Sequence, residues 1–232
     1  MSTLAPVRFR GTPLALTAAV GEPPGSYRVC FDPAAGVPPE VDAVAVAADP
    51  LLRLHLPRTT PPGTYEGRLI VGDRERAALI TVDPEVFLRL LPERLILEAS
   101  AGDQLQIDLT LLNLGNVAVE LRGAYAFGMF DVGGTERAIG KMVVDGGYEG
   151  KRRVDVFADA IADEHGGVVR VKVESGAGEI APGETRDLSV RFHVPDHVRP
   201  GRTYWGTWPI HNMRYYVRIT ARAGDSLHGA KS

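Results

Sequence analysis

Cysteine is almost missing from this sequence, because Cys30 is the only one in a chain of 232 residues. No intramolecular disulfide can form, and zinc or iron–sulfur sites that need several cysteine ligands are excluded. Cys30 itself could be a nucleophile, but it lies within the alternating run SYRVCF (26–31). A thiol in such a run is expected to face the core and to be inert.

Strong net charge and long apolar runs are missing as well. The formal net charge of -3 provides no field that would attract nucleic acid or an anionic membrane. No run approaches the about 20 apolar residues that span a bilayer, so no integral membrane segment is expected. Arg8 and Arg10 precede the apolar run LALTAAV (14–20), which faintly resembles an export signal but is short. A cytoplasmic location is favoured, with export as the alternative.

Patterns that would hold a metal ion are scarce. His193 and His197 lie four residues apart, with His211 nearby. A spacing of four suits one face of a helix, whereas His193 falls at the end of an alternating run and Pro195 separates the pair. No cysteine or tight acidic cluster completes a ligand set, so we expect no metal site.

Catalytic motifs are equally scarce. The segment GTERAIGKM (134–142) has five residues between its glycines, one more than a phosphate-binding loop, and Met142 stands where that loop needs a hydroxyl. The acidic residues of FADAIADEHGG (157–167) fit a solvated helical face better than a calcium loop. No paired carboxylates or nucleophile constellation is visible, so we expect no enzyme activity and no cofactor.

Short runs in which apolar and polar residues alternate, separated by proline and glycine, dominate the first part of the chain. Such runs are typical of half-buried antiparallel strands. They predict strands at 7–10, 14–20, 26–31, 42–47, 51–56, 64–71 and 77–82. Strands of this number and spacing are typical of an immunoglobulin-like sandwich, which we place at residues 1–85.

The alternating pattern then restarts. It predicts strands at 95–100, 105–112, 117–121, 168–173, 186–194, 203–208 and 213–220. A glycine-rich stretch at about 122–167 is longer than a sandwich loop needs. We therefore predict an all-β chain of two tandem immunoglobulin-like antiparallel sandwiches. The second sandwich, at 86–222, contains the glycine-rich insertion, and a flexible tail follows at 223–232.

One short sequence motif, the repeated phrase, occurs twice, as PPGTYEG (61–67) and PGRTYWG (200–206). Each copy follows an alternating strand that ends at a proline. Proline fixes φ and glycine accepts positive φ, so the chain can turn there from one sheet to the other. Tyr65 and Tyr204 would then point inward and hydrogen-bond to the backbone of the crossing, an arrangement called a tyrosine corner.

The segments LPERLILEASAGDQLQIDLTLLNLGNVAVEL (91–121) and IAPGETRDLSVRFHVP (180–195) resemble bacterial immunoglobulin-like or fibronectin type III-like modules. These are modules of the cell-adhesion-related and sugar-hydrolase-associated kind. Their Asn-x-Gly-Asn and Pro-Gly-acidic motifs are matched by Asn113, Gly115 and Asn116 and by Pro182, Gly183 and Glu184. The resemblance implies two tandem, non-catalytic modules that serve a larger assembly. The two-sandwich plan is also similar to that of periplasmic pilus chaperones.

The last hairpin carries the strongest candidate contact surface. If Tyr204 points inward, alternation places five side chains outward: Trp205, Thr207, Arg214, Tyr216 and Arg218. A two-residue turn at Ile210 and His211 would set Trp205 opposite Tyr216. The outward residues are either a binding surface or core that the insertion covers.

Two classes of function fit these features. The first is a structural or partner-binding subunit that docks through its second sandwich onto another protein or onto a copy of itself. Its candidate contact residues are Trp205, Tyr216, Arg214, Arg218 and His211. The alternative is a carbohydrate-binding accessory module that stacks a sugar on Trp205 and Tyr216.

Overall fold

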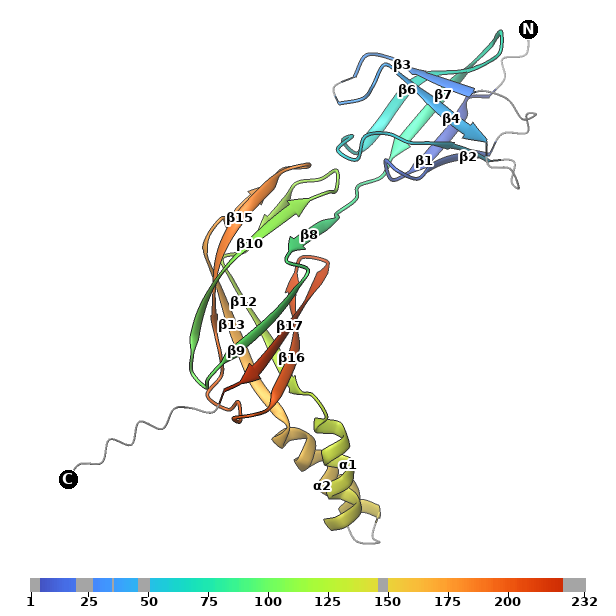
Figure 1. The fold of residues 1–232 in the computed structure, drawn as a ribbon. Coiled ribbons are helices and arrows are strands. Elements are labelled where there is room, and N and C mark those ends of the chain that lie inside the picture. The colour runs from blue at the N-terminus through green and yellow to red at the C-terminus, as the bar shows by residue number, and fades with distance from the viewer. Residues whose placement is uncertain (1–4, 20–26, 35, 46–50, 146–149, 223–232) are drawn as a thin grey trace, which may run out of the picture. The chain divides into compact units, whose positions relative to one another are not determined.

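The computed structural model describes residues 5–19, 27–34, 36–45, 51–145 and 150–222, and it is mostly β-structure (Figure 1). The chain forms two compact units. The first contains Met1–Arg89, Leu112–Val119 and Glu179–Thr185, and the second contains Leu90–Leu111, Glu120–Gly178 and Arg186–Ser232. A single boundary near residue 85 therefore does not separate them, because two later segments pack with the first unit. The predicted tail at 223–232 lies outside the described residues.

The first unit contains the seven predicted strands, but they close into a barrel instead of two facing sheets. The barrel order is β1-β2-β5-β4-β3-β6-β7, and it closes because β1 pairs in parallel with β7. Alternate residues of each strand fill its core, among them Phe9, Val29, Leu54, Leu69 and Ile80. The strands are β1 (Val7–Gly11), β2 (Leu16–Ala19), β3 (Tyr27–Phe31), β4 (Glu40–Ala45), β5 (Leu51–Leu54), β6 (Gly63–Val71) and β7 (Arg74–Val82).

The prediction that Cys30 faces the core was wrong. On β3, Val29 and Phe31 are buried and Cys30 between them is half-buried. Neighbouring side chains on a strand point to opposite faces, so burying Val29 and Phe31 turns the thiol toward the outside of the barrel.

The Asn-x-Gly-Asn motif has a structural role within the first unit. The side chain of Asn116 accepts a hydrogen bond from the Glu85 amide at 2.6 Å and donates one to the Asp83 carbonyl at 3.1 Å. Asn113 donates to two backbone carbonyls, at 2.8 and 3.0 Å. A side chain at Gly115 would collide with the Glu85 carbonyl, since its Cβ would lie 2.2 Å from that oxygen. The motif therefore satisfies backbone groups where chain segments meet.

The second unit is built on an eight-stranded sheet with the order β8-β10-β15-β13-β12-β16-β17-β9. Its core centres on the buried Trp208, which makes edge contacts with the rings of Tyr125, Phe192 and Tyr215. The sheet comprises β8 (Leu88–Leu91), β9 (Arg94–Ala99), β10 (Gln104–Asn113), β12 (Ala124–Asp131), β13 (His165–Ser175), β15 (Thr185–His193), β16 (Thr203–Ile210) and β17 (Met213–Ala221). A two-stranded sheet pairs β11 (Val119–Leu121) with β14 (Gly178–Ile180).

The stretch predicted as a glycine-rich insertion is regular structure over most of its described length. It forms β12, then the antiparallel helices α1 (Gly134–Asp145) and α2 (Gly150–Asp163), and then the start of β13. At some of its glycines, neighbouring atoms leave no room for a side chain. A Cβ at Gly166 would lie 2.5 Å from the ring of Tyr204.

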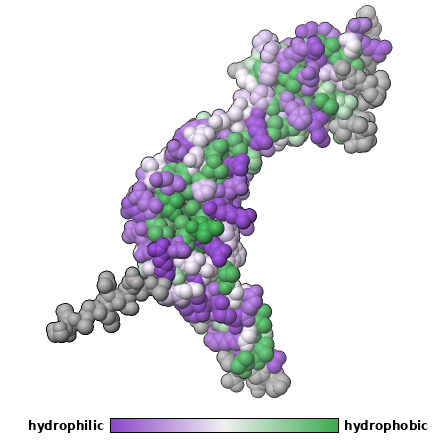
Figure 2. Space-filling model, in the orientation of Figure 1, coloured by the Kyte–Doolittle hydropathy of each residue, from purple (hydrophilic) through white to green (hydrophobic). Residues whose placement is uncertain are grey.

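Helices α1 and α2 lie side by side as a hairpin, and Figure 2 shows apolar surface along one edge of it. In the part of the chain that the structure describes, neither helix is long and apolar enough to cross a membrane.

Candidate functional site

Five neighbouring strands of the second unit, in the order β13-β12-β16-β17-β9, share one exposed face. Phe130 on β12 is paired with Trp205 on β16, and Trp205 is paired with Arg218 on β17. Arg218 in turn lies beside Ile96 on β9. Residues that lie opposite one another on adjacent strands point to the same face, so these four exposed side chains form a continuous row.

A second row on this face contains Tyr216, which is paired with Thr207 and lies beside Arg94. The rings of Trp205 and Tyr216 are nearly parallel, at 15° with centroids 6.4 Å apart, and the Phe130 ring lies 5.8 Å from Trp205. We refer to Phe130, Trp205 and Tyr216 as the aromatic strip. Their exposed fractions of 49%, 39% and 37% show that the described part of the insertion does not cover the strip.

The turn of the last hairpin was predicted at Ile210 and His211, but it lies one residue further along the chain. Ile210 is paired with Met213, so the two turn residues are His211 and Asn212. Ile210 is buried and pairs with Met213, so it is the last residue of its strand and does not belong to the turn. His211 is exposed and takes the positive φ of 52° that a tight hairpin turn needs. Trp205 therefore lies diagonally across from Tyr216.

Arginine side chains surround the aromatic strip. The four on this face that make no hydrogen bond or ion pair with the rest of the described chain are Arg94, Arg170, Arg214 and Arg218. Glu98 and Glu174, on the same face, are already paired with Arg222 at 3.2 Å and with Lys172 at 3.0 Å. The strip is therefore an apolar surface within a positively charged face, although the whole chain has a net charge of -3.

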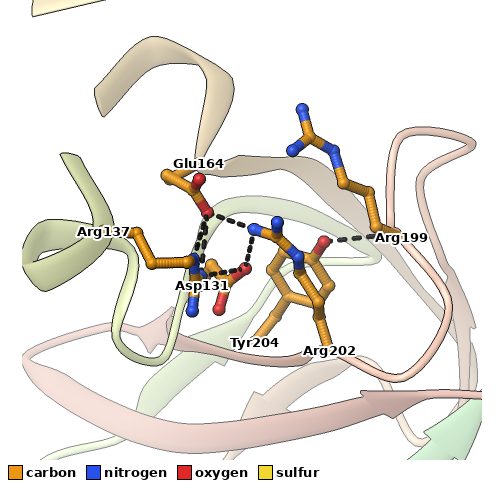
Figure 3. A network of polar contacts seen from close by, with 6 residues as sticks. All are labelled: Asp131, Arg137, Glu164, Arg199, Arg202 and Tyr204. Atoms are coloured by element: carbon orange, nitrogen blue, oxygen red, sulfur yellow. Dashed lines mark hydrogen bonds and ion pairs between the residues drawn. The ribbon is translucent and has the colours of Figure 1, made fainter. Parts of the chain in front are cut away.

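A network of four charged side chains holds the helical hairpin to this sheet (Figure 3). Asp131 ends β12 and Glu164 precedes β13, so both carboxylates lie where the hairpin leaves the sheet. Arg137 donates to Asp131 at 2.5 Å and to Glu164 at 2.8 Å, while Arg202 donates to Asp131 at 2.7 Å and also to Glu164. Two guanidinium groups thus bridge the two carboxylates.

The charges in this network stabilise one another. Burial raises the pKa of Glu164, but the hydrogen bonds and charges of Arg137 and Arg202 outweigh burial, and the pKa lies below its usual value. Hydrogen bonds to Glu164 and Asp131 raise the pKa of Arg137. Glu164, Arg137 and Arg202 are therefore charged near neutral pH. Sequence reasoning missed this network because its members are separated along the chain and meet only in the folded unit.

The two tyrosines of the repeated phrase both bond to nearby backbone. The buried Tyr204 hydroxyl accepts the amide hydrogen of Arg199 at 2.9 Å (Figure 3). The half-buried Tyr65 donates its hydroxyl hydrogen to the Pro61 carbonyl at 2.7 Å. Both bonds tie the tyrosine to the turn that precedes its strand.

Histidines and carboxylates do not gather into a metal site in the described segments of the chain, where no group of three or more His, Cys, Asp or Glu side chains could hold an ion. His193 lies within β15, paired with Arg170, and His211 lies in the last hairpin turn.

No family model matches this chain, and no curated protein sequence matches it. Three solved structures illustrate what it is similar to. Domains 4 and 5 of the S-layer protein SbsC are 12% identical, with 89% of this chain and 76% of that chain covered and a TM-score of 0.28. A protein of unknown function from Porphyromonas gingivalis W83 is 11% identical, with coverage of 94% and 96% and a TM-score of 0.29. The structure of Dpr11 IG1 bound to DIP-gamma IG+IG2 gives 10% identity, coverage of 96% and 98%, and a TM-score of 0.30. Likeness this weak carries no argument about function.

Proposed function

We propose that this protein is a non-catalytic, partner-binding module that docks onto another protein, or onto a copy of itself, through the aromatic strip. The observation that carries the proposal is the exposure of three aromatic rings in contact with one another on a single sheet face. Fully burying a Phe-sized side chain contributes about 1.5–3 kcal/mol, and each of these rings, which are 37–49% exposed, would contribute a part of that on docking. Three adjacent rings therefore provide a substantial part of a binding free energy.

The composition of the face supports the same proposal. Protein interfaces are enriched in aromatic residues and arginine and depleted in lysine and carboxylates, and Trp, Tyr and Arg dominate binding energies. The strip combines a tryptophan, a tyrosine and a phenylalanine with four arginines that have no partner in the described chain. Strands hold the strip on both sides, so little conformational entropy is lost when a partner binds.

The test compares the wild-type protein with the double variant Trp205→Ala, Tyr216→Ala. Tagged protein is recovered from the cells that naturally produce it, and native mass spectrometry identifies what remains bound. We expect an associated chain with the wild type and its loss from the variant, whose thermal unfolding stays cooperative. Phe87→Ala, which removes an exposed aromatic ring from the first unit, is the matched control and should retain the partner. An unchanged complex with the double variant would refute the proposal.

The nearly parallel rings of Trp205 and Tyr216 support one second candidate, a carbohydrate-binding module. Calorimetric titration with a panel of polysaccharides separates the two. Heat that is released by the wild type and abolished in the double variant, without any bound protein, favours the carbohydrate.

A further inference from the structure

A second exposed apolar surface lies on the helical hairpin of the same unit. Ala138 of α1 and Ala160 of α2 are buried, whereas Val143 and Val154 are each 64% exposed and Ile139 is also exposed. Exposed aliphatic side chains grouped on one element mark a contact surface more often than a solvated one. Figure 2 shows this apolar edge of the hairpin.

These apolar residues share one side of the hairpin. Ile139 directly follows the buried Ala138, and Val143 lies one turn further along α1. On α2, Ile161 directly follows the buried Ala160, and Val154 lies two turns before Ile161. Ala138 and Ala160 are the buried residues between the two helices. Because the helices run antiparallel, the residue that directly follows each of them points to the same side of the hairpin. The four side chains therefore form one surface, which we call the hairpin edge.

Carboxylates flank the hairpin edge. Asp155 is exposed on α2 and directly follows Val154. Glu136 is exposed on α1, one turn before Ile139 and two turns before Val143. Neither of these two carboxylates has an ion pair or hydrogen bond with the other described residues. The hairpin edge is thus an apolar surface with a negative border, the counterpart of the aromatic strip with its positive border.

We propose that the hairpin edge of one molecule docks onto the aromatic strip of a second copy of this chain. The inference rests on the proposed function and names its partner. Apolar side chains meet apolar rings, and Asp155 and Glu136 meet arginines that have no partner in the described part of their own chain. Complementary charge of this kind selects the partner and sets its orientation.

The contact has to form between two molecules. The charged network of Asp131, Arg137, Glu164 and Arg202 fixes both ends of the hairpin where it leaves the sheet. Figure 1 shows α1 and α2 extending away from the strands of their own unit. The edge and the strip are different surfaces, so the contact either closes reciprocally into a dimer or continues from copy to copy.

Charge reversal tests this inference. One variant carries Glu136→Arg and Asp155→Arg on the hairpin, and the other carries Arg214→Glu and Arg218→Glu beside the strip. Sedimentation equilibrium over a wide concentration range should show association of the wild type and at least about tenfold weaker association of each variant. Mixed together, the two variants should associate again, because arginines on one hairpin then face glutamates beside the other strip.

Two charge reversals outside the proposed contact serve as controls. Arg53→Glu and Glu66→Arg, exposed sites in the first unit, should leave the association unchanged. A wild type that stays monomeric, variants that associate normally, or a mixture that fails to associate would each overturn the docking of two copies. If a different protein is lost from Trp205→Ala, Tyr216→Ala but kept by the hairpin variant, the strip still binds a partner and only the second copy is refuted.

Discussion

Replacing Asp131 with alanine should lower the free energy of unfolding of the second unit by about 1–3 kcal/mol. The buried Asp131 carboxylate accepts hydrogen bonds from Arg137 at 2.5 Å and from Arg202 at 2.7 Å. Removing one member of a buried ion pair costs about 3–5 kcal/mol, because the other charge is left without a partner. Here the arginine side chains are 42% and 28% exposed, so water replaces part of the lost interaction and the cost is smaller.

Urea denaturation measures this effect as a shift of the unfolding midpoint at constant slope. In a double-mutant cycle, the effects of Asp131→Ala and Arg202→Ala on the free energy of unfolding should not add, because the two side chains interact directly. Asp42→Ala is the control, because Asp42 is highly exposed and lies 3.9 Å from its arginine. If Asp131→Ala unfolds at the same urea concentration as the control, the network does not hold the hairpin.

The same network should make stability depend on acid. Burial acts to raise the pKa of Glu164, but Arg137 and Arg202 bring it below the usual value. A lowered pKa stabilises the folded state above the unfolded-state pKa of about 4.3, and this contribution is lost as pH falls through the folded-state pKa. The wild type should therefore lose more stability than Glu164→Gln between neutral and acid pH. Parallel curves for the two proteins would contradict the assignment.

Three further outcomes are expected. Tyr204→Phe leaves the Arg199 amide without its buried acceptor and should cost about 1–3 kcal/mol, whereas Tyr65→Phe should cost less because Tyr65 is half-buried; thermal melts that reverse this order would be contrary evidence. Gly166→Ala drives a methyl group into the Tyr204 ring and should cost about 1–3 kcal/mol, so an unchanged melting temperature would show that the packing there is loose. Burial raises the pKa of Tyr215 to about 12, so its stabilising effect should persist below pH 10 and fade as pH rises toward 12; an ultraviolet titration in which every tyrosine ionises near pH 10 would refute this.

The aromatic strip was only partly predictable. Alternation along the last two strands predicts that Trp205 and Tyr216 point outward, and both are exposed. Phe130 was missed, although β12 also alternates, because its glycine and alanines weaken the apolar signal. Its position beside Trp205 depends on the pairing of β12 with β16, which lie far apart in the sequence. No local pattern encodes that pairing.

Local patterns determined the positions of most strands and which face of each strand is buried, because both depend on the two-residue period of the backbone. The closure of the first unit, the register of the last hairpin and the neighbours of each strand came from tertiary structure. In the barrel, the first strand β1 pairs with the last strand β7, which is far from it in the sequence. In the hairpin, Ile210 is buried and paired with Met213, so the turn begins one residue later than predicted. The charged network of Asp131, Arg137, Glu164 and Arg202 has the same origin. Each residue alone is an ordinary surface charge, and only folding brings the four together where the hairpin leaves the sheet.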